Sequence, residues 1–197
     1  MGTISEKKNI VIFASGSGSN AQRLLEHFEQ HPQIQVVALF SNNAEAFALQ
    51  RAQNFGVPAL VFDRAALKAG EVQAQVESYS PDLIVLAGFL WLLPASFVQA
   101  FPNKIINIHP SLLPKFGGKG MHGQHVHQAV LDAREAQTGI TIHYVNEHYD
   151  EGAPIFQEFC EVQPQDTCET LSARVLALEH RHLPRVVEKL LTTGTPS

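Results

Sequence analysis

Short apolar runs alternate with longer segments of helical spacing through the first half of the chain. Gly56 closes one such segment, at 44–55, and Gly70 is a weak point in another, at 63–79. The runs between them predict strands that are buried on both faces. Strands and helices in alternation predict parallel crossovers, so we expect an α/β fold with a doubly wound, mostly parallel (Rossmann-like) sheet. The predicted strands are 9–14, 35–40, 58–62, 83–87 and 104–108.

The pattern changes after Gly139. Ile140 and Ile142 alternate with Thr141 and His143, which predicts a strand with one apolar and one polar face. A second strand is expected at 155–162. Both are expected to extend the sheet in mixed or antiparallel fashion near the carboxyl end.

A last helix is expected to start near a capping-box spacing, from Asp166 to Glu169. Pro184 lies within its apolar pattern and is expected to kink or interrupt it. The tail at 192–197 is expected to fray.

Length and composition predict one domain over residues 1–197, with a core at about 9–191. The net charge is −5, and no basic stripe or long apolar span is present, which argues against nucleic acid and membrane as partners. The first six residues contain no apolar leader segment. Cys160 and Cys168 make no disulfide framework, so we expect reduced thiols and a cytoplasmic location.

A glycine loop, residues 15–20, joins the first predicted strand to a helix. The free amides and positive dipole end of a helix amino terminus suit a phosphate group. Gly16, Gly18 and Ala21 also fit a dinucleotide fingerprint, but that use needs an acidic residue after the second strand, and residues 40–43 contain none. We therefore favour a phosphate monoester over NAD; a tight turn without a ligand is the alternative.

Asn107 and His109 stand two residues apart at the end of a predicted strand, so both side chains leave the same face. Pro110 and Pro114 end that strand. Asp150 lies in a later glycine-bearing loop, and a contact with His109 would favour the imidazolium. An amide donor, an acid and a carboxylate together suit acyl transfer without a covalent nucleophile. The alternative is a strand-end pair that bonds loop carbonyls.

Two histidine-containing segments have simpler interpretations. His122, His125 and His127 match no common zinc spacing, so we expect no metal and a polar loop that leads into a helix at 126–133. Residues 179–182, within the last helix, are most simply a solvated face.

Several motifs together resemble the phosphoribosylglycinamide formyltransferase family, the folate-dependent enzymes of purine biosynthesis. The resemblance extends from about residue 9 to residue 190. The Asn-x-His-Pro-Ser-x-Leu-Pro segment alone marks the wider formyltransferase superfamily. The motifs are Ser15-Gly16-x-Gly18-Ser19-Asn20, Phe40-Ser41-Asn42, Leu86-Ala87-Gly88-Phe89, Asn107-Ile108-His109-Pro110-Ser111-Leu112-Leu113-Pro114, His143-Tyr144-Val145 and Asp150-x-Gly152.

The resemblance implies transfer of a formyl group from 10-formyltetrahydrofolate, as co-substrate, to the amine of glycinamide ribonucleotide. It implies small-molecule substrates and a monomer or homodimer. The catalytic residues implied are Asn107, His109 and Asp150. The residues implied for the ribonucleotide are Gly18, Ser19, Asn20, Ala21, Gln22 and Glu179. Those implied for folate are Arg64, Leu90, Trp91, Leu92, Leu93, Asn107, Asn146, Glu147, His148 and Tyr149.

Two features depart from the family pattern. Many members have Arg where Trp91 stands, and the loop at 115–123 is longer than in the compact bacterial form. Trp91 is either a core ring or an aromatic wall beside the folate. Two other functions stay open: hydrolysis of the same folate, which the glycine loop disfavours, and a non-catalytic folate or nucleotide sensor, which the three polar residues disfavour.

Overall fold

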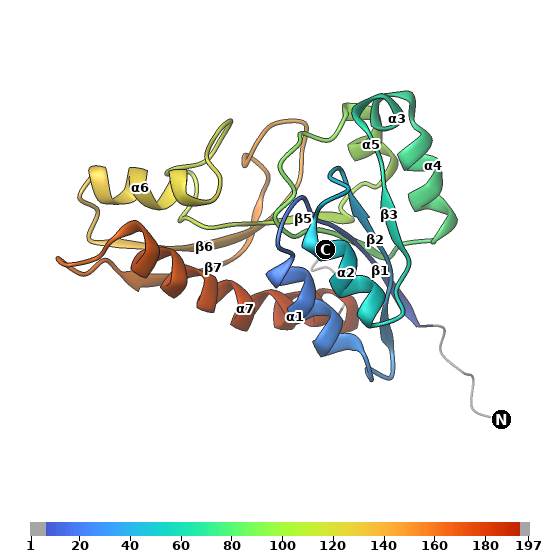
Figure 1. Cartoon of the computed structure of the whole chain (residues 1–197), viewed down its shortest axis with the longest axis horizontal. Helices are drawn as coiled ribbons and strands as arrows, with labels where there is room; N and C mark the ends of the chain where they lie inside the picture. Colours follow the sequence, from blue (N-terminus) through green and yellow to red (C-terminus); the bar gives the residue numbers. More distant parts are fainter. Residues whose placement is uncertain (1–6, 194–197) are drawn as a thin grey trace.

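A computed structural model describes residues 7–193, which form a seven-stranded sheet with helices on both faces (Figure 1). The strand order is β3-β2-β1-β4-β5-β6-β7. The first five of these pair in parallel, whereas β6 and β7 are added antiparallel. The strands are β1 (Lys8–Phe13), β2 (Ile34–Ser41), β3 (Ala59–Val61), β4 (Leu83–Leu86), β5 (Ile105–His109), β6 (Gln137–Tyr144) and β7 (Pro154–Glu161).

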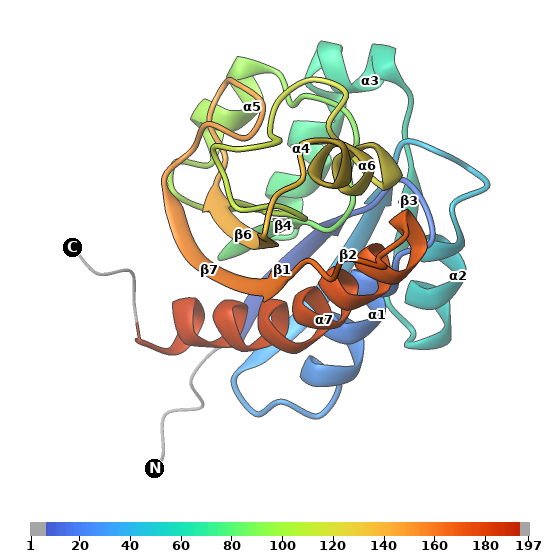
Figure 2. The ribbon, with the colours of Figure 1, turned by 90° about the vertical axis from the view of Figure 1, so that its left-hand side faces the viewer.

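Helices cover both faces of the sheet (Figure 2), and an apolar core lies between each layer of helices and the sheet. Ile10 and Ile12 of β1 face the core under α1, α2 and α7, while Val11 and Phe13 face the core under α3, α4 and α5. This alternation is what a strand buried on both faces requires. The helices are α1 (Ser19–Phe28), α2 (Phe47–Asn54), α3 (Arg64–Ala69), α4 (Glu71–Ser78), α5 (Ala95–Ala100), α6 (Gln124–Asp132) and α7 (Cys168–Thr193).

The predicted fold class is confirmed, and the predicted bounds of two helices are wrong in detail. Gly70, with φ 84°, divides the segment at 63–79 into α3 and α4. The segment at 44–55 turns helical only at Phe47. Pro184 lies inside an uninterrupted α7, so the interruption is excluded and the kink stays a prediction.

The capping of α7 also differs from the prediction. Thr167 and Thr170 cap each other, with amide-to-hydroxyl distances of 3.0 and 3.3 Å. Asp166 instead accepts two hydrogen bonds from Arg174, which hold the pKa of that carboxyl well below its usual value. No helix of the described residues has the length and apolar character to cross a membrane. The predictions for residues 1–6 and 194–197 lie outside the described residues.

Candidate functional site

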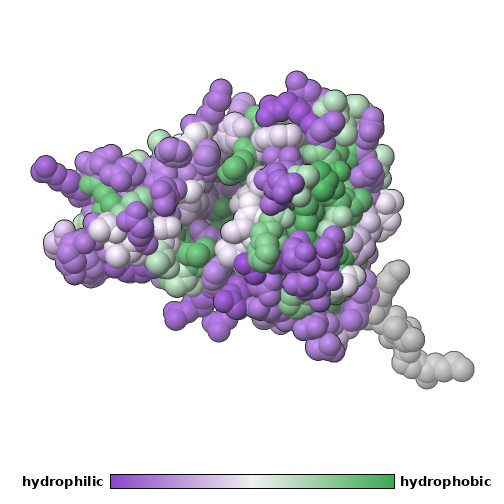
Figure 3. Space-filling model, in the orientation of Figure 1, coloured by the Kyte–Doolittle hydropathy of each residue, from purple (hydrophilic) through white to green (hydrophobic). Residues whose placement is uncertain are grey.

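A cavity of about 530 Å³ lies where the carboxyl ends of β1, β4 and β5 meet. In open α/β sheets ligands bind where the connections leave to opposite sides, here between β1 and β4. The surface is hollowed between the part that carries α6 and the rest of the molecule (Figure 3). The cavity's lining includes the segments 16–20, 86–93, 107–110 and 118–123, together with Tyr149, Asp150 and Glu179.

Ser15 joins three strand ends beneath this cavity. Its hydroxyl donates to Asn42 Oδ1 at 2.6 Å and accepts from the amide of Leu90 at 3.0 Å, and its own amide donates to the carbonyl of Gly88 at 3.1 Å. Asn42 follows β2, where a dinucleotide site needs an acidic residue to bind ribose. The side-chain amide of Asn42 joins two loops and supplies no carboxylate for a ribose. This agrees with the preference for a phosphate monoester over NAD.

The glycine loop presents main-chain amides to the cavity. Gly18 has φ 69°, and a Cβ added there would lie 2.5 Å from Ala48 Cβ, so only glycine fits. Within the described residues, none of the hydrogen bonds is donated by a main-chain amide of residues 17–21. These amides lie at the amino terminus of α1, where the helix dipole adds positive potential. The loop therefore has the features of an anion site.

Glu179 reaches the cavity from α7 and is buried, so the prediction of a solvated face is wrong for this residue. Asn20 Nδ2 donates a hydrogen bond to its carboxyl, while Asn20 Oδ1 is buried without a partner among the described residues. Burial raises the pKa of Glu179 to about 7, against the opposing effect of Asn20. Leu171, Val175 and Leu183 occupy the same stripe of α7 at four-residue spacing, a signal of burial that the sequence did contain.

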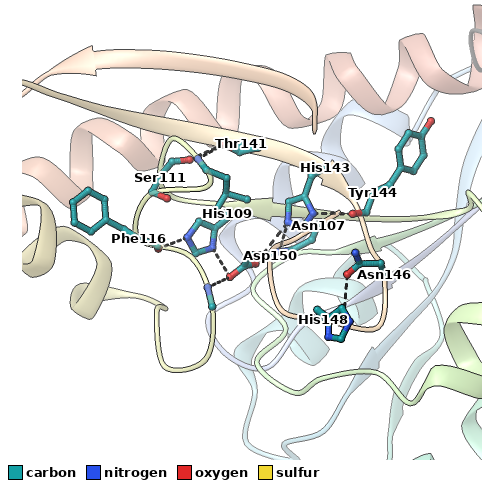
Figure 4. Close-up of polar contacts among 12 residues, drawn as sticks. Asn107, His109, Ser111, Phe116, Thr141, His143, Tyr144, Asn146, His148 and Asp150 are labelled. Carbon is teal, nitrogen blue, oxygen red and sulfur yellow. Dashed lines mark hydrogen bonds and ion pairs between the residues drawn. The ribbon is translucent and has the colours of Figure 1, made fainter. Parts of the chain in front are cut away.

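Asp150 contacts both Asn107 and His109 (Figure 4). Asn107 Nδ2 donates to Asp150 Oδ1 at 3.3 Å, and His109 Nδ1 lies 3.4 Å from Asp150 Oδ2. The predicted convergence of the Asn107 and His109 side chains is therefore found. All three residues line the cavity, and β4 separates the end of β5, which carries Asn107 and His109, from the glycine loop after β1.

Burial lowers the pKa of His109 below its usual value. Asp150 and the carbonyl of Phe116 act in the opposite direction, as predicted for Asp150, but burial outweighs them. The expectation that Asp150 favours the imidazolium is right in direction, although burial makes the net effect a lowered pKa of His109. Its Nε2–H donates to the carbonyl of Phe116 at 2.8 Å, because a carbonyl can only accept.

His143 is a residue of this cluster that sequence reasoning did not assign. It stands opposite Asn107 in the antiparallel pairing of β5 and β6. Its Nδ1–H donates to the carbonyl of Tyr144 at 2.8 Å, so its Nε2 accepts from Asn107 Nδ2 at 3.1 Å. This bond fixes which way the Asn107 amide faces. The signal in the sequence was the polar face of the strand at 139–145.

Asp150 stays ionised through several contacts. Burial alone would raise its pKa, but the contacts with His143 and His109 and the amide of Gly118, at 2.9 Å, bring the pKa of Asp150 below its usual value. Its backbone has φ 56°, in the left-handed region that Asp tolerates. A carboxylate thus lies between two buried imidazoles.

The segment predicted for folate lies beside a second, smaller cavity of about 260 Å³. Leu90, Trp91, Leu92 and Leu93 line the main cavity, and Trp91 to Leu93 line the second as well. Trp91 packs edge-on against Phe62 and lies under the guanidinium of Arg64, 4.4 Å from the ring centroid. The ring is half-buried, so it both packs on the core and borders the cavities.

The chain is similar to known proteins of one family. The family described as formyl transferase matches residues 8–187. The chain belongs to the formyl transferase family. A curated plant member, the chloroplastic phosphoribosylglycinamide formyltransferase of Arabidopsis thaliana, is 40% identical over 188 residues, which cover 92% of this chain and 64% of that protein. The chain thus spans about three fifths of the length of that relative and of the one from Vigna unguiculata.

Solved structures of family members share the fold. The phosphoribosylglycinamide formyltransferase of Anaplasma phagocytophilum superposes with a TM-score of 0.87 at 35% identity, covering 95% of this chain and 89% of that one. The enzyme of the same name from Brucella melitensis gives 0.85 at 39% identity, covering 98% and 100%. The chain therefore shares its fold, over nearly its whole length, with solved structures of phosphoribosylglycinamide formyltransferases.

The other predicted site residues differ in which of the two cavities they line. Gly18, Ser19, Asn20 and Glu179 line the main cavity with the catalytic candidates, as does Tyr149. Arg64 and Glu147 line only the second cavity. Neither cavity includes the remaining four, of which Ala21 is fully buried: Ala21, Gln22, Asn146 and His148.

The helix after this loop begins at Gln124, two residues earlier than predicted, while His122 lies in the loop as expected. His125 and His127 both lie on α6, and His127 is buried with its Nδ1 unpartnered within the described part of the chain. His122 and His125 meet edge-on, with ring centroids 5.5 Å apart. Residues 7–193 contain no group of three or more His, Cys, Asp or Glu side chains placed to hold a metal ion.

Proposed function

We propose that the chain transfers the formyl group of 10-formyltetrahydrofolate to the primary amine of glycinamide ribonucleotide, in purine biosynthesis. The observation that carries this proposal is a single cavity with two different ends. One end has free main-chain amides suited to a phosphate, and the other has Asn107, His109 and Asp150. The names of the relatives support the same reaction.

The ribonucleotide phosphate binds the amides of Gly18, Ser19 and Asn20, with Ala21 and Gln22 continuing the helix behind them. Glu179 contacts the same substrate, and Asn20 holds its carboxyl in place. The phosphate contact and the Glu179 contact both lie at the glycine-loop end, and together they orient the substrate's amine toward Asn107, His109 and Asp150. Positioning of this kind converts an encounter of two substrates into a nearly unimolecular step.

At the catalytic end the amine attacks the formyl carbon. Asn107 donates to the oxygen that becomes negative once one of its N–H groups leaves Asp150 or His143, and His109 adds its Nε2–H once that group leaves the carbonyl of Phe116. The new carbon–nitrogen bond forms as the bond to the folate nitrogen breaks. Asp150 takes a proton from the attacking amine and returns it to the folate nitrogen, so charge and protons balance.

The folate occupies the side walled by Leu90, Trp91, Leu92 and Leu93. From the loop at 146–149, Tyr149 lines the main cavity with Asn107, and Glu147 lines the second cavity. Asn146 and His148 hold the turn of that loop through a hydrogen bond, and Arg64 binds an anionic end of the folate. We further propose that residues 1–197 act as one domain, as a monomer or homodimer in the cytoplasm, with no metal.

An absorbance assay of folate release, run with and without glycinamide ribonucleotide, tests the proposal. Release should require the ribonucleotide. Release at the same rate without it would identify hydrolysis of the folate, and binding without any release would identify a sensor.

A further inference from the structure

Helix α2 closes the back of the glycine loop through two hydrogen bonds. The amide of Ala48 donates to the carbonyl of Gly16 at 3.1 Å, and Arg51 Nε donates to the carbonyl of Ser17 at 2.8 Å. The next carbonyl along, that of Gly18, accepts from the amide of Gln22 at 2.8 Å within α1. Three successive carbonyls of the loop are thus held by protein donors.

The direction of these carbonyls sets the direction of the amides. A peptide unit is planar and trans, so the N–H of one residue points opposite to the C=O of the residue before it. The carbonyls of Gly16 and Ser17 point toward α2, so the amides of Ser17 and Gly18 point away from α2. The carbonyl of Gly18 points along α1, so the amide of Ser19 points away from the rest of that helix. These three residues line the cavity.

Arg51 is the one side chain in this set of donors, and it is itself held in two further ways. Its Nη1 donates to Gln22 Oε1 at 3.1 Å, and its guanidinium lies 4.8 Å from the ring centroid of Phe47. Phe47 is 55% exposed, so its ring contributes little to the core and packs against the Arg51 guanidinium at the surface. These contacts hold the guanidinium behind the loop.

We propose that Arg51 is a positioning residue that sets the main-chain direction of the glycine loop for phosphate binding. The inference rests on the proposed function, because it takes the loop as the phosphate site. Without Arg51, the peptide between Ser17 and Gly18 is free to turn its carbonyl toward the anion. A phosphate would then meet a lone pair in place of an N–H donor.

The expected result for Arg51→Ala is a rise of about tenfold or more in KM for glycinamide ribonucleotide, the size of one lost hydrogen bond to a charged group. Competitive inhibition by inorganic phosphate should weaken by a similar factor. The KM for folate and kcat should change much less, because the catalytic residues lie at the other end of the cavity. Arg51→Lys keeps the charge but offers one nitrogen for two acceptors, so its effect should be intermediate.

Arg23→Ala is the matched control. Arg23 carries the same charge on α1, pairs with Glu26 at 2.8 Å, is exposed, and has no hydrogen bond to the loop. This variant should stay within about twofold of the wild type in every parameter, because a surface ion pair contributes little. If Arg23→Ala matches Arg51→Ala, the effect is one of net charge and the proposal is overturned.

Folding and the phosphate assignment are checked separately. Thermal unfolding of each variant shows whether it is native, and Arg51→Lys carries the test if Arg51→Ala does not fold. A native Arg51 variant with unchanged phosphate inhibition overturns the inference while leaving the proposed function in place. A wild type whose glycinamide-ribonucleotide-dependent activity is insensitive to phosphate removes the phosphate site, and with it the inference. A wild type without that activity fails the proposed function.

Discussion

The two ends of the cavity are built in different ways. The glycine-loop end uses main-chain amides, fixed by a tight turn between β1 and α1 and by close contact with α2. The other end uses side chains from β5, β6 and the loop that holds Asp150, which are far apart in the sequence. One end binds a charge that any well-directed set of amides can hold, whereas the other needs particular chemical groups.

This difference explains how each end should respond to substitution. A main-chain site is lost only when the backbone is displaced, so residues behind the loop matter as much as those lining it. A side-chain site is lost when a single functional group is removed, even if its shape is kept.

Asp150→Asn keeps the size of the side chain and removes its charge. Two effects should combine: Asp150 no longer relays the proton, and His109 loses the carboxylate that opposes the effect of burial on its pKa. We expect kcat to fall by a factor on the order of 10² or more with little change in either KM. Glu151→Gln, at the exposed neighbouring position, should leave kcat unchanged. Steady-state kinetics measures both, and a kcat near that of wild type would remove Asp150 from the mechanism.

Gly18→Val should damage the opposite end. The new Cβ would meet Ala48 at 2.5 Å, and the residue would have to adopt φ 69°, so the loop must move. We expect KM for glycinamide ribonucleotide to rise roughly tenfold or more, and stability to fall by about 1–3 kcal/mol.

Gly56→Val separates backbone strain from loop displacement. Gly56 also has φ 69°, but a Cβ there meets nothing within 4 Å. The Gly56→Val variant should be less stable than the wild type, while its KM for glycinamide ribonucleotide stays unchanged.

Equal efficiency of the wild type with phosphorylated and unphosphorylated substrate would end the assignment of the glycine loop as the phosphate site.

The same contrast decides how much the sequence could predict. The parallel half of the sheet and the glycine loop were predictable because each strand, turn and helix carries its own local pattern. His143 was not, because its contact with Asn107 depends on the register between β5 and β6. The lowered pKa of His109 depends on burial, which no local pattern gives. The contact of Arg51 with Ser17 likewise depends on the packing of α2 against the loop.

Glu179 gives a smaller, pH-dependent effect on stability. Its pKa is raised from 4.5 to about 7 in the folded protein, so between these values the folded state binds more protons than the unfolded state. The stability of the wild type should therefore fall, relative to Glu179→Gln, as pH rises from about 5 to 8. The expected difference in Tm grows by roughly 5–10 °C over this range. Thermal unfolding of both proteins across pH measures it, and parallel curves would mean that Glu179 is not buried as described.

Trp91→Ala should have the smallest effect, because the ring contributes a wall and no reacting group. Loss of stacking is expected to weaken folate binding several-fold, at about 0.5–1.5 kcal/mol, without changing kcat. Trp91 is the only tryptophan, so its emission should change when a non-reactive folate analogue is added, after correction for the analogue's absorbance, and much less with glycinamide ribonucleotide. Arg64→Ala removes the cation over the ring and should itself alter the emission of the free protein. If the analogue leaves the emission unchanged while Trp91→Ala lowers Tm alone, the ring serves the aromatic cluster with Phe62, and the folate contacts a different wall of the cavity.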